Sequence, residues 1–278
     1  AMVHAVIEKM LASLGHHPDF GVHMVACFNL NARKSCVTFP AVYSVWNHAG
    51  FAKLNLHDSH WQSRESARRF CQDLNPFYIT GDPAGLAEFM AWDIPARPKV
   101  IISTAMQLSP ALKIALEERY DCPVLDWYST TETGPIACSC LENAGMHLTC
   151  PDVFVEILGE DGAALPEGEH GQIAITGGRN PYLPLVRYLT GDRAALDASP
   201  CACGNKAPRL VDLAGRKPVV FRATDGTPVN PADIGLAMRD NLAFVQHCLT
   251  QKKDASLHLV VRPVPGAVLD APKLERII

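Results

Sequence analysis

The sequence predicts an α/β protein in which a mainly parallel sheet carries helices on both faces. Short apolar runs of strand length alternate with stretches of helical periodicity through the first 137 residues. This alternation is typical of parallel strands joined by helical crossovers. No apolar run reaches the roughly 18 residues that a membrane-spanning helix requires.

The helices are expected where apolar spacing and capping residues coincide. Residues 2–14 place apolar side chains at helical intervals. A helix over 110–120 should begin at Pro110, with Ser109 as its N-cap, because both residue types are favourable at those positions. Further helices are expected over 63–74 and 84–92. The strands of the sheet are expected at 22–28, 52–56, 77–79, 100–102 and 124–127.

The pattern changes after Cys138. Residues 153–158 and 172–176 alternate in polarity around a turn cluster at 159–162, which predicts a small antiparallel β region. We therefore expect a large domain over 1–214, made of the sheet (1–137) and this β region (138–214).

A second, smaller domain of α+β type is expected over 215–278. Its signals are a strand at 218–221, a turn at Asp225-Gly226, and a helix with Asn230 as N-cap and Pro231 at its first position. A further strand is expected at 257–261.

Charge and cysteine content restrict the class of protein. The net charge is −4 and the pI about 6.3, so there is no basic excess for general nucleic-acid binding. The ten cysteines accompany no secretory signal, since His4, Glu8 and Lys9 interrupt the apolar N-terminal stretch. We therefore expect a cytoplasmic protein without a membrane or nucleic-acid partner. A homodimer is compatible with the sequence.

Three short motifs carry groups suited to binding a nucleotide. Residues 126–134 read Asp-Trp-Tyr-Ser-Thr-Thr-Glu-Thr-Gly, residues 187–192 read Arg-Tyr-Leu-Thr-Gly-Asp, and Gly215-Arg216 follows. Carboxylate oxygen suits Mg²⁺ and the hydroxyls of a ribose, and a guanidinium can reach phosphate. Each motif alone also fits a plain alternative: Tyr128 as a core residue before a polar loop, and Thr-Gly-Asp as an ordinary turn.

Together and in this order, the motifs resemble the ATP site of the adenylate-forming superfamily, which includes the acyl- and aryl-CoA ligases. The tract Pro-Leu-Val-Arg-Tyr at 184–188 is similar to the phenylacetate–CoA ligase branch, as are residues 75–81 and 116–120. The resemblance extends from residue 75 to residue 234. It departs from the pattern at Ser129, where the family usually has glycine.

The resemblance implies a role for each motif residue. Tyr128 would lie against the adenine of ATP or AMP, Thr131 would contact the α-phosphate, and Glu132 would hold Mg²⁺. Asp192 would accept hydrogen bonds from the ribose. Arg216 would begin a mobile C-terminal lid and reach ribose or phosphate. Thr131, Glu132 and Arg216 are thus the expected catalytic residues. The implied reaction activates a carboxylic acid as an acyl-adenylate and transfers it to coenzyme A or another acceptor.

We expect the acid to be aromatic. In this fold its pocket would be walled by residues 43–51, 79–83 and 103–107, where Trp46, Phe51 and Met106 offer apolar surface and charged groups are scarce. The alternative is that Trp46 and Met106 belong to the core.

Four residues predict a structural zinc site. Cys140 and His147 are seven residues apart, and Cys201 and Cys203 form a tight pair before a glycine. Brought together, they give the closed Cys₃His ligand set of structural zinc. The alternative is that they are buried free thiols. The competing ligands are Cys138 and Cys150.

Some features of the family are not found. The sequence has no glycine-, serine- and threonine-rich phosphate loop, Lys273 does not lie in the setting of the family's catalytic lysine, and Pro218 occupies the lid hinge. We therefore expect an incomplete lid over 215–278, in either a fragment of a longer ligase or a protein that no longer adenylates. In the second case the chain would be a non-catalytic, zinc-stabilised nucleotide- or acyl-binding homologue.

Overall fold

The computed structural model describes residues 2–32, 37–142, 144–149, 151–178, 180–215, 221–229 and 244–264, with the single residues 234, 266, 268, 270, 272 and 274. The chain divides into two compact units, Ala1–Arg216 and Lys217–Ile278. Each unit is described by itself.

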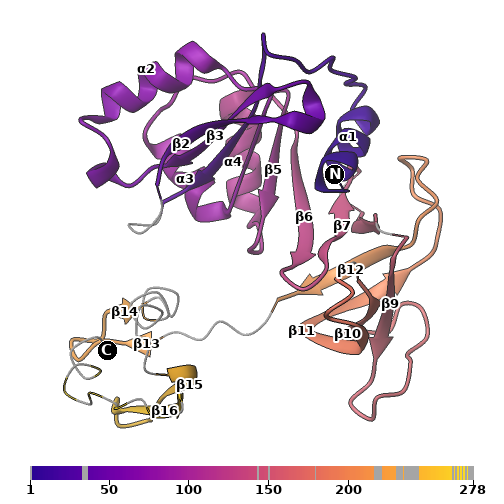
Figure 1. Ribbon diagram of the computed structural model, residues 1–278. Helices are drawn as coiled ribbons and strands as arrows, with labels where there is room; N and C mark the ends of the chain where they lie inside the picture. Colours follow the sequence, from indigo (N-terminus) through magenta and orange to yellow (C-terminus); the bar gives the residue numbers. More distant parts are fainter. Residues whose placement is uncertain are drawn as a thin grey trace. The chain divides into compact units, whose positions relative to one another are not determined.

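The first unit is built on one 12-stranded sheet with the order β2-β3-β1-β4-β5-β6-β7-β8-β12-β11-β10-β9 (Figure 1). Neighbours among β3, β1, β4, β5 and β6 pair in parallel, and all other pairs are antiparallel. The parallel strands are β1 (Val25–Asn31), β3 (Ala49–Asn55), β4 (Tyr78–Gly81), β5 (Val100–Thr104) and β6 (Val124–Thr130). The antiparallel strands are β2 (Phe39–Tyr43), β7 (Gly134–Ser139), β8 (Met146–Leu148), β9 (Val153–Leu158), β10 (Gly171–Gly177), β11 (Leu185–Asp197) and β12 (Arg209–Ala214).

The predicted α/β class is confirmed, but the β region is not a separate sheet. The hairpin of β6 and β7 turns at residues 131–133 and continues the hydrogen-bond ladder from the parallel strands into the antiparallel ones. The β region has its own apolar cluster, in which Ile136, Ile157 and Ile175 are buried.

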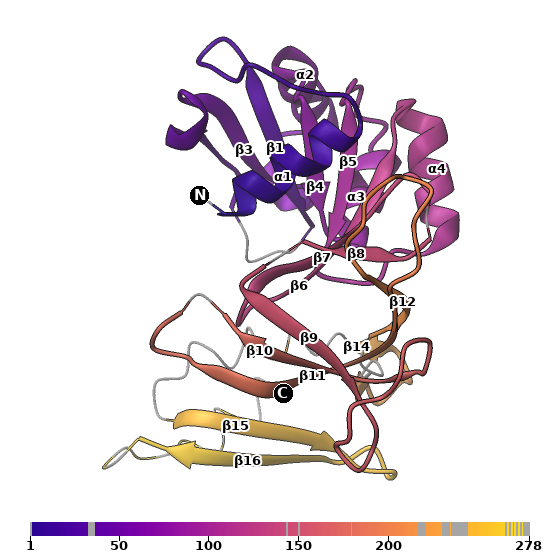
Figure 2. The ribbon, with the colours of Figure 1, turned by 90° about the vertical axis from the view of Figure 1, so that its right-hand side faces the viewer.

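Helices cover both faces of the parallel strands (Figures 1 and 2). Helix α1 (Met2–Ser13) packs on one face, and α2 (Arg64–Leu74), α3 (Pro83–Ala91) and α4 (Pro110–Tyr120) pack on the other. Successive side chains of a strand point to opposite faces. Tyr78 accordingly packs in the cluster beneath α1, and Ile79 packs in the cluster beneath the other helices.

The predicted helix starts reflect real caps. The Ser109 hydroxyl accepts the backbone N–H of Leu112 at 3.2 Å, and Pro110 is the first residue of α4, as the sequence indicates. Strand β2 was not predicted. It lies at the sheet edge with four of its five residues exposed and a proline within it, so it lacks the alternation that marks a half-buried strand.

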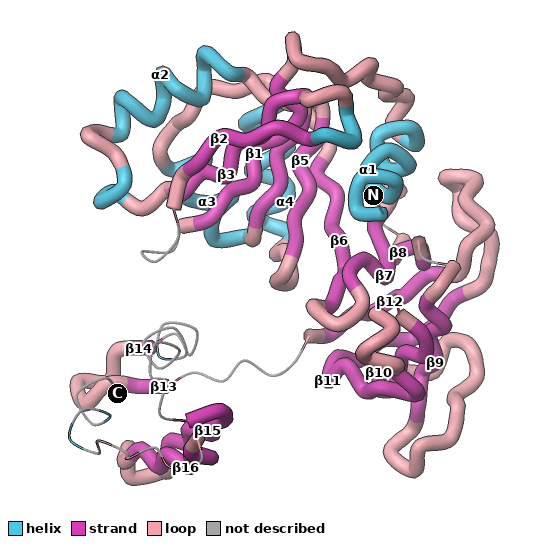
Figure 3. Tube along the Cα trace, viewed as in Figure 1, coloured by secondary structure: helices cyan, strands magenta, loops and turns pink. Residues whose placement is uncertain are grey.

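The second unit contains two hairpins in its described part (Figure 3). Strand β13 (Phe221–Arg222) pairs with β14 (Pro228–Val229) around Asp225-Gly226, and β15 (Phe244–Gln251) pairs with β16 (Leu257–Pro263). The predicted turn and the predicted strand at 257–261 are confirmed. Arg216, Pro218 and Lys273 lie outside the described residues, as do all residues of the helix expected after Asn230 except Ile234. Within the part of the chain that is described, no helix combines the length and apolarity needed to cross a membrane.

Candidate functional site

The first motif ends strand β6 and forms the turn that follows it. Thr130 pairs with Gly134 across the hairpin, and the hydroxyls of Thr130 and Thr133 lie 2.9 Å apart. The backbone N–H of Thr133 donates to Oγ1 of Thr130 at 3.3 Å. These bonds close the turn, which leaves Thr131 exposed and Glu132 half-buried.

Strand β11 brings the second motif against the first. The hydroxyl of Tyr128 donates to Oδ2 of Asp192 at 2.8 Å and lies 3.2 Å from Oγ1 of Thr190. Thr190 is buried and accepts the backbone N–H of Asp192 at 3.1 Å. Three strands separate β6 from β11 in the sheet order, so the sheet bends to bring these side chains together. The ring of Tyr128 packs against the apolar cluster of the β region.

A second hydrogen bond joins the same two elements. The hydroxyl of Tyr188 on β11 donates to Oε1 of Glu132 at 2.9 Å. Each of the two carboxylates, Glu132 and Asp192, therefore receives a tyrosine hydroxyl from the opposite motif. The structure thus pairs Tyr128 with Asp192 and Glu132 with Tyr188, and both pairs join the first motif to the second.

Tyr188 is a member of this group that motif analysis did not single out. The signal was available, because Tyr188 ends the Pro-Leu-Val-Arg-Tyr tract and lies four residues before Asp192. Its neighbour Arg187 forms an ion pair of 2.9 Å with Glu156 instead.

Asp126, the first residue of the motif, is a partly buried acid. Its Oδ1 accepts the backbone N–H of Trp127 at 3.0 Å. Burial raises the pKa of this carboxyl above its usual value, and the hydrogen bond from Trp127 opposes the rise. Ionisation of Asp126 therefore costs more free energy in the folded chain than in the unfolded chain.

The expectation that Trp46 lines an acid pocket is wrong for this structure. Trp46 is 4% exposed, its ring lies against His4 and Phe20, and its Nε1 donates to Glu8 at 2.5 Å. It is a core residue beneath α1. Met106, by contrast, is 56% exposed.

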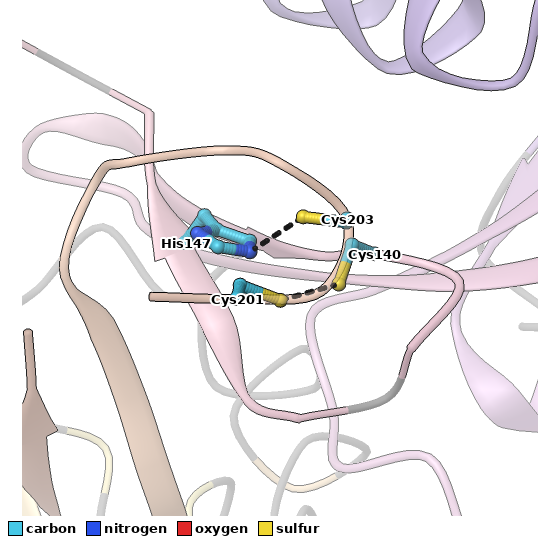
Figure 4. A group of neighbouring side chains, drawn as sticks. All are labelled: Cys140, His147, Cys201 and Cys203. Atoms are coloured by element: carbon cyan, nitrogen blue, oxygen red, sulfur yellow. Dashed lines mark hydrogen bonds between the residues drawn. The ribbon is translucent and has the colours of Figure 1, made fainter. Parts of the chain in front are cut away.

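The four residues of the expected metal site lie together. One donor atom each from Cys140, His147, Cys201 and Cys203 lies within 4.8 Å of all the others. Figure 4 shows the four side chains pointing toward one another, with His147 on strand β8 and the three cysteines on the connections beside it. Sγ of Cys140 lies 3.8 Å from Sγ of Cys201, and Sγ of Cys203 lies 3.3 Å from Nε2 of His147.

These spacings and donors fit zinc. Zinc–sulfur bonds of about 2.3 Å in a tetrahedron separate two sulfurs by about 3.8 Å. Nδ1 of His147 lies 3.0 Å from the carbonyl oxygen of Ala207. Since a carbonyl only accepts, Nδ1 carries the proton and Nε2 faces the sulfurs as a ligand would.

Backbone N–H groups donate hydrogen bonds to the sulfurs of Cys201 and Cys203. The N–H of Asn205 donates to Sγ of Cys203 at 3.5 Å. Hydrogen bonding from the backbone of Cys203 lowers the pKa of Cys201 to about 6, whereas burial raises the pKa of Cys140 to about 11. The competitor Cys138 packs against the cluster beneath α1, and Cys150 lies outside the described residues.

The cysteine–histidine cluster is separate from the tyrosine–carboxylate group. Glu132 precedes β7 and Cys140 follows it. A strand of this length spans about 20 Å. The cluster instead joins the β7–β8 connection and β8 to the connection between β11 and β12.

Comparison with known proteins shows the family of the chain. The model of the AMP-binding enzyme family matches residues 16–180, more than half of the chain. The chain therefore belongs to the AMP-binding enzymes, which form adenylates. The predicted resemblance to this superfamily is confirmed.

Two curated relatives are acyl-CoA ligases by name. The chain is 34% identical over 108 residues to phenylacetate-coenzyme A ligase of Thermus thermophilus, which covers 38% of this chain and 24% of the relative. It is 31% identical over 100 residues to acetyl-coenzyme A synthetase of Wolinella succinogenes, which covers 34% of this chain and 15% of the relative.

The fold is shared with a solved 2-hydroxyisobutyryl-CoA ligase, in an open conformation with 2-HIB-AMP and CoA. The TM-score is 0.59 at 18% identity, covering 99% of this chain and 62% of that one. The chain thus spans less than two thirds of the length of these relatives.

Proposed function

We propose that the chain takes part in the ATP-dependent activation of a carboxylic acid to an acyl-adenylate. The observation that carries this proposal is the pairing of Tyr188 with Glu132 and of Tyr128 with Asp192. It links the turn after β6 to β11 through two tyrosine–carboxylate hydrogen bonds, in a chain that belongs to the AMP-binding enzymes.

Each residue has a proposed role. The Asp192 carboxylate accepts hydrogen bonds from the vicinal hydroxyls of a ribose, a role suited to a group that only accepts. Thr131, exposed on the turn, supplies a hydroxyl to the α-phosphate, and Tyr128 borders the adenine while holding Asp192. The Arg216 guanidinium binds the ribose or a phosphate.

Glu132 is the proposed Mg²⁺ ligand. Its carboxylate accepts the hydroxyl of Tyr188 at Oε1, and carboxylate oxygens are donors that a hard cation prefers. Bound Mg²⁺ would neutralise phosphate charge. The chain's own contribution is positioning, which is the main source of catalysis in phosphoryl chemistry.

We propose coenzyme A as the acyl acceptor and an aromatic acid as the substrate. Support comes from the names of the relatives, which include phenylacetate-coenzyme A ligase. The unit Lys217–Ile278 is the proposed lid.

Calorimetry with AMP, followed by pyrophosphate release with ATP, Mg²⁺ and an acid, tests the function. The acids are phenylacetate, benzoate, acetate and a free amino acid. Saturable AMP binding with release that depends on an aryl acid supports the proposal. AMP binding without release in any arm would favour the non-catalytic nucleotide-binding alternative. No AMP binding would remove both.

We also propose that Cys140, His147, Cys201 and Cys203 bind one structural zinc ion, because their donor types and spacings match a closed site. Metal analysis of protein purified without chelators tests this. About one equivalent of zinc per chain is expected, and metal-free folded protein would contradict it.

A further inference from the structure

Arg209 is a buried cation that contacts two separate segments of the β region. It begins β12 and is 5% exposed. Its Nη1 donates to the carbonyl oxygen of Ala144 at 3.0 Å. Its Nη2 donates to Oδ2 of Asp197 at 2.5 Å, to Oγ of Ser199 at 2.9 Å and to the carbonyl oxygen of Ser199 at 3.3 Å.

The contacted segments are the ones that carry the four cluster residues. Ala144 lies in the connection between Cys140 and His147, and Ser199 lies two residues before Cys201. Arg209 itself lies opposite His147 in the β12–β8 ladder. One guanidinium therefore contacts both ligand segments, and the residue that carries it pairs with the histidine across the two strands.

A cavity lies beside the cluster. Its volume is about 430 Å³. The cavity is lined by Cys140, His147 and Cys203 and by Lys9, Met10 and Ser13 of α1. On this side the ligand segments border the cavity, and the hydrogen bonds of Arg209 contact them elsewhere.

The segment between Cys140 and His147 also approaches β12 so closely that a side chain would not fit at Gly145. At Gly145, φ is +109°, and a Cβ would lie 2.7 Å from the carbonyl oxygen of Leu210. This approach brings Ala144 within reach of Arg209. A planar guanidinium can donate to the loops on both sides at once, whereas an ammonium cannot reproduce that fork.

We propose that Arg209 is the positioning residue of the metal centre. It holds the loop 140–147 and the segment 197–203 at ligand spacing before metal binds, so the affinity for metal depends on it. This inference rests on the proposed zinc site. Removing such supporting contacts typically costs about 10- to 100-fold in metal affinity.

Co²⁺ titration of metal-free protein, read by its thiolate absorbance, and competition with a zinc chelator measure the effect. The variants are Arg209→Lys and Asp197→Asn. In the wild type, Oδ1 of Asp197 accepts the backbone N–H of Ser199 at 2.8 Å. Asp197→Asn keeps an oxygen for this bond and so preserves the turn at residues 197–199. The control is Arg64→Lys, which disrupts a two-bond Arg–Asp pair with Asp58 in the α/β part of the chain.

We expect both Arg209→Lys and Asp197→Asn to weaken metal binding by about 10-fold or more, with Arg64→Lys unchanged. A lowered Tm with unchanged metal affinity would assign Arg209 to folding alone and overturn the proposal. If Arg209→Lys does not fold, Asp197→Asn decides by the same criterion. Absence of metal binding by the wild-type chain would instead overturn the zinc site itself, and this inference with it.

Discussion

The hydroxyl of Tyr188 donates a 2.9 Å hydrogen bond to Oε1 of Glu132. The bond links strand β11 to the turn between β6 and β7 and restricts the rotation of the Glu132 side chain. Restricting a flexible carboxylate beforehand lowers the entropy lost when it binds a cation.

Tyr188→Phe is therefore expected to raise the Mg²⁺ concentration needed for ATP binding. The substitution removes one oxygen and keeps the ring in the apolar cluster of the β region. Binding of AMP without Mg²⁺ should be unchanged. Calorimetry at several Mg²⁺ concentrations measures both, and Tyr182→Phe, at a residue 93% exposed, is the control. Equal Mg²⁺ dependence of ATP binding in variant and wild type would show that Tyr188 does not affect cation binding, and would contradict the prediction.

Asp192→Ala is expected to weaken AMP binding by about 1.5–3 kcal/mol, the usual contribution of hydrogen bonds to a charged group. The reason is the loss of the acceptor proposed for the ribose. Calorimetry gives the change directly. Asp93→Ala, which disturbs only the surface pairs with Arg68 and Arg119, is the matched control. An unchanged affinity in Asp192→Ala would contradict the assignment.

Zinc should stabilise the fold through Cys201. Because a metal that binds only the folded chain adds to its stability, Cys201→Ala should lower the free energy of unfolding. Excess chelator should destabilise the wild type and shrink the difference between it and Cys201→Ala. Cys71→Ala, at a buried thiol in α2, should show the same loss with and without chelator. Urea unfolding with both media tests this, and a chelator-independent loss in Cys201→Ala would argue against a metal.

Asp126→Asn should become more stable than the wild type as the pH rises. Burial raises the folded pKa of Asp126 above its unfolded value, so the protonated form favours folding. This contribution to the free energy of unfolding is fully present below the unfolded pKa and is lost as the pH rises through the folded pKa. Asparagine does not ionise, so the stability of Asp126→Asn lacks this pH dependence. Urea midpoints of the two proteins at about pH 4 and about pH 7.5 bracket the change. A constant difference would show that ionisation of Asp126 does not affect folding.

Local signals in the sequence determined the α/β class and most element positions of the first unit. Helix α4 begins and ends where its cap and apolar spacing indicate, and β9 spans the residues that alternate in polarity. These features depend on neighbours a few residues apart, whose periodicity and capping act within one element. The same holds for the motif residues and for the four candidate metal ligands, since their types and spacings are visible in the chain.

Only the tertiary structure decided which of these residues meet and what supports them. The Tyr128–Asp192 contact joins residues 64 positions apart, and it requires a bent 12-stranded sheet that no local pattern encodes. The roles of Tyr188 and Arg209, the edge position of β2 and the burial of Trp46 are decided in the same way. Each depends on strand register and on packing between distant segments, and register is fixed by the whole sheet rather than by any one strand.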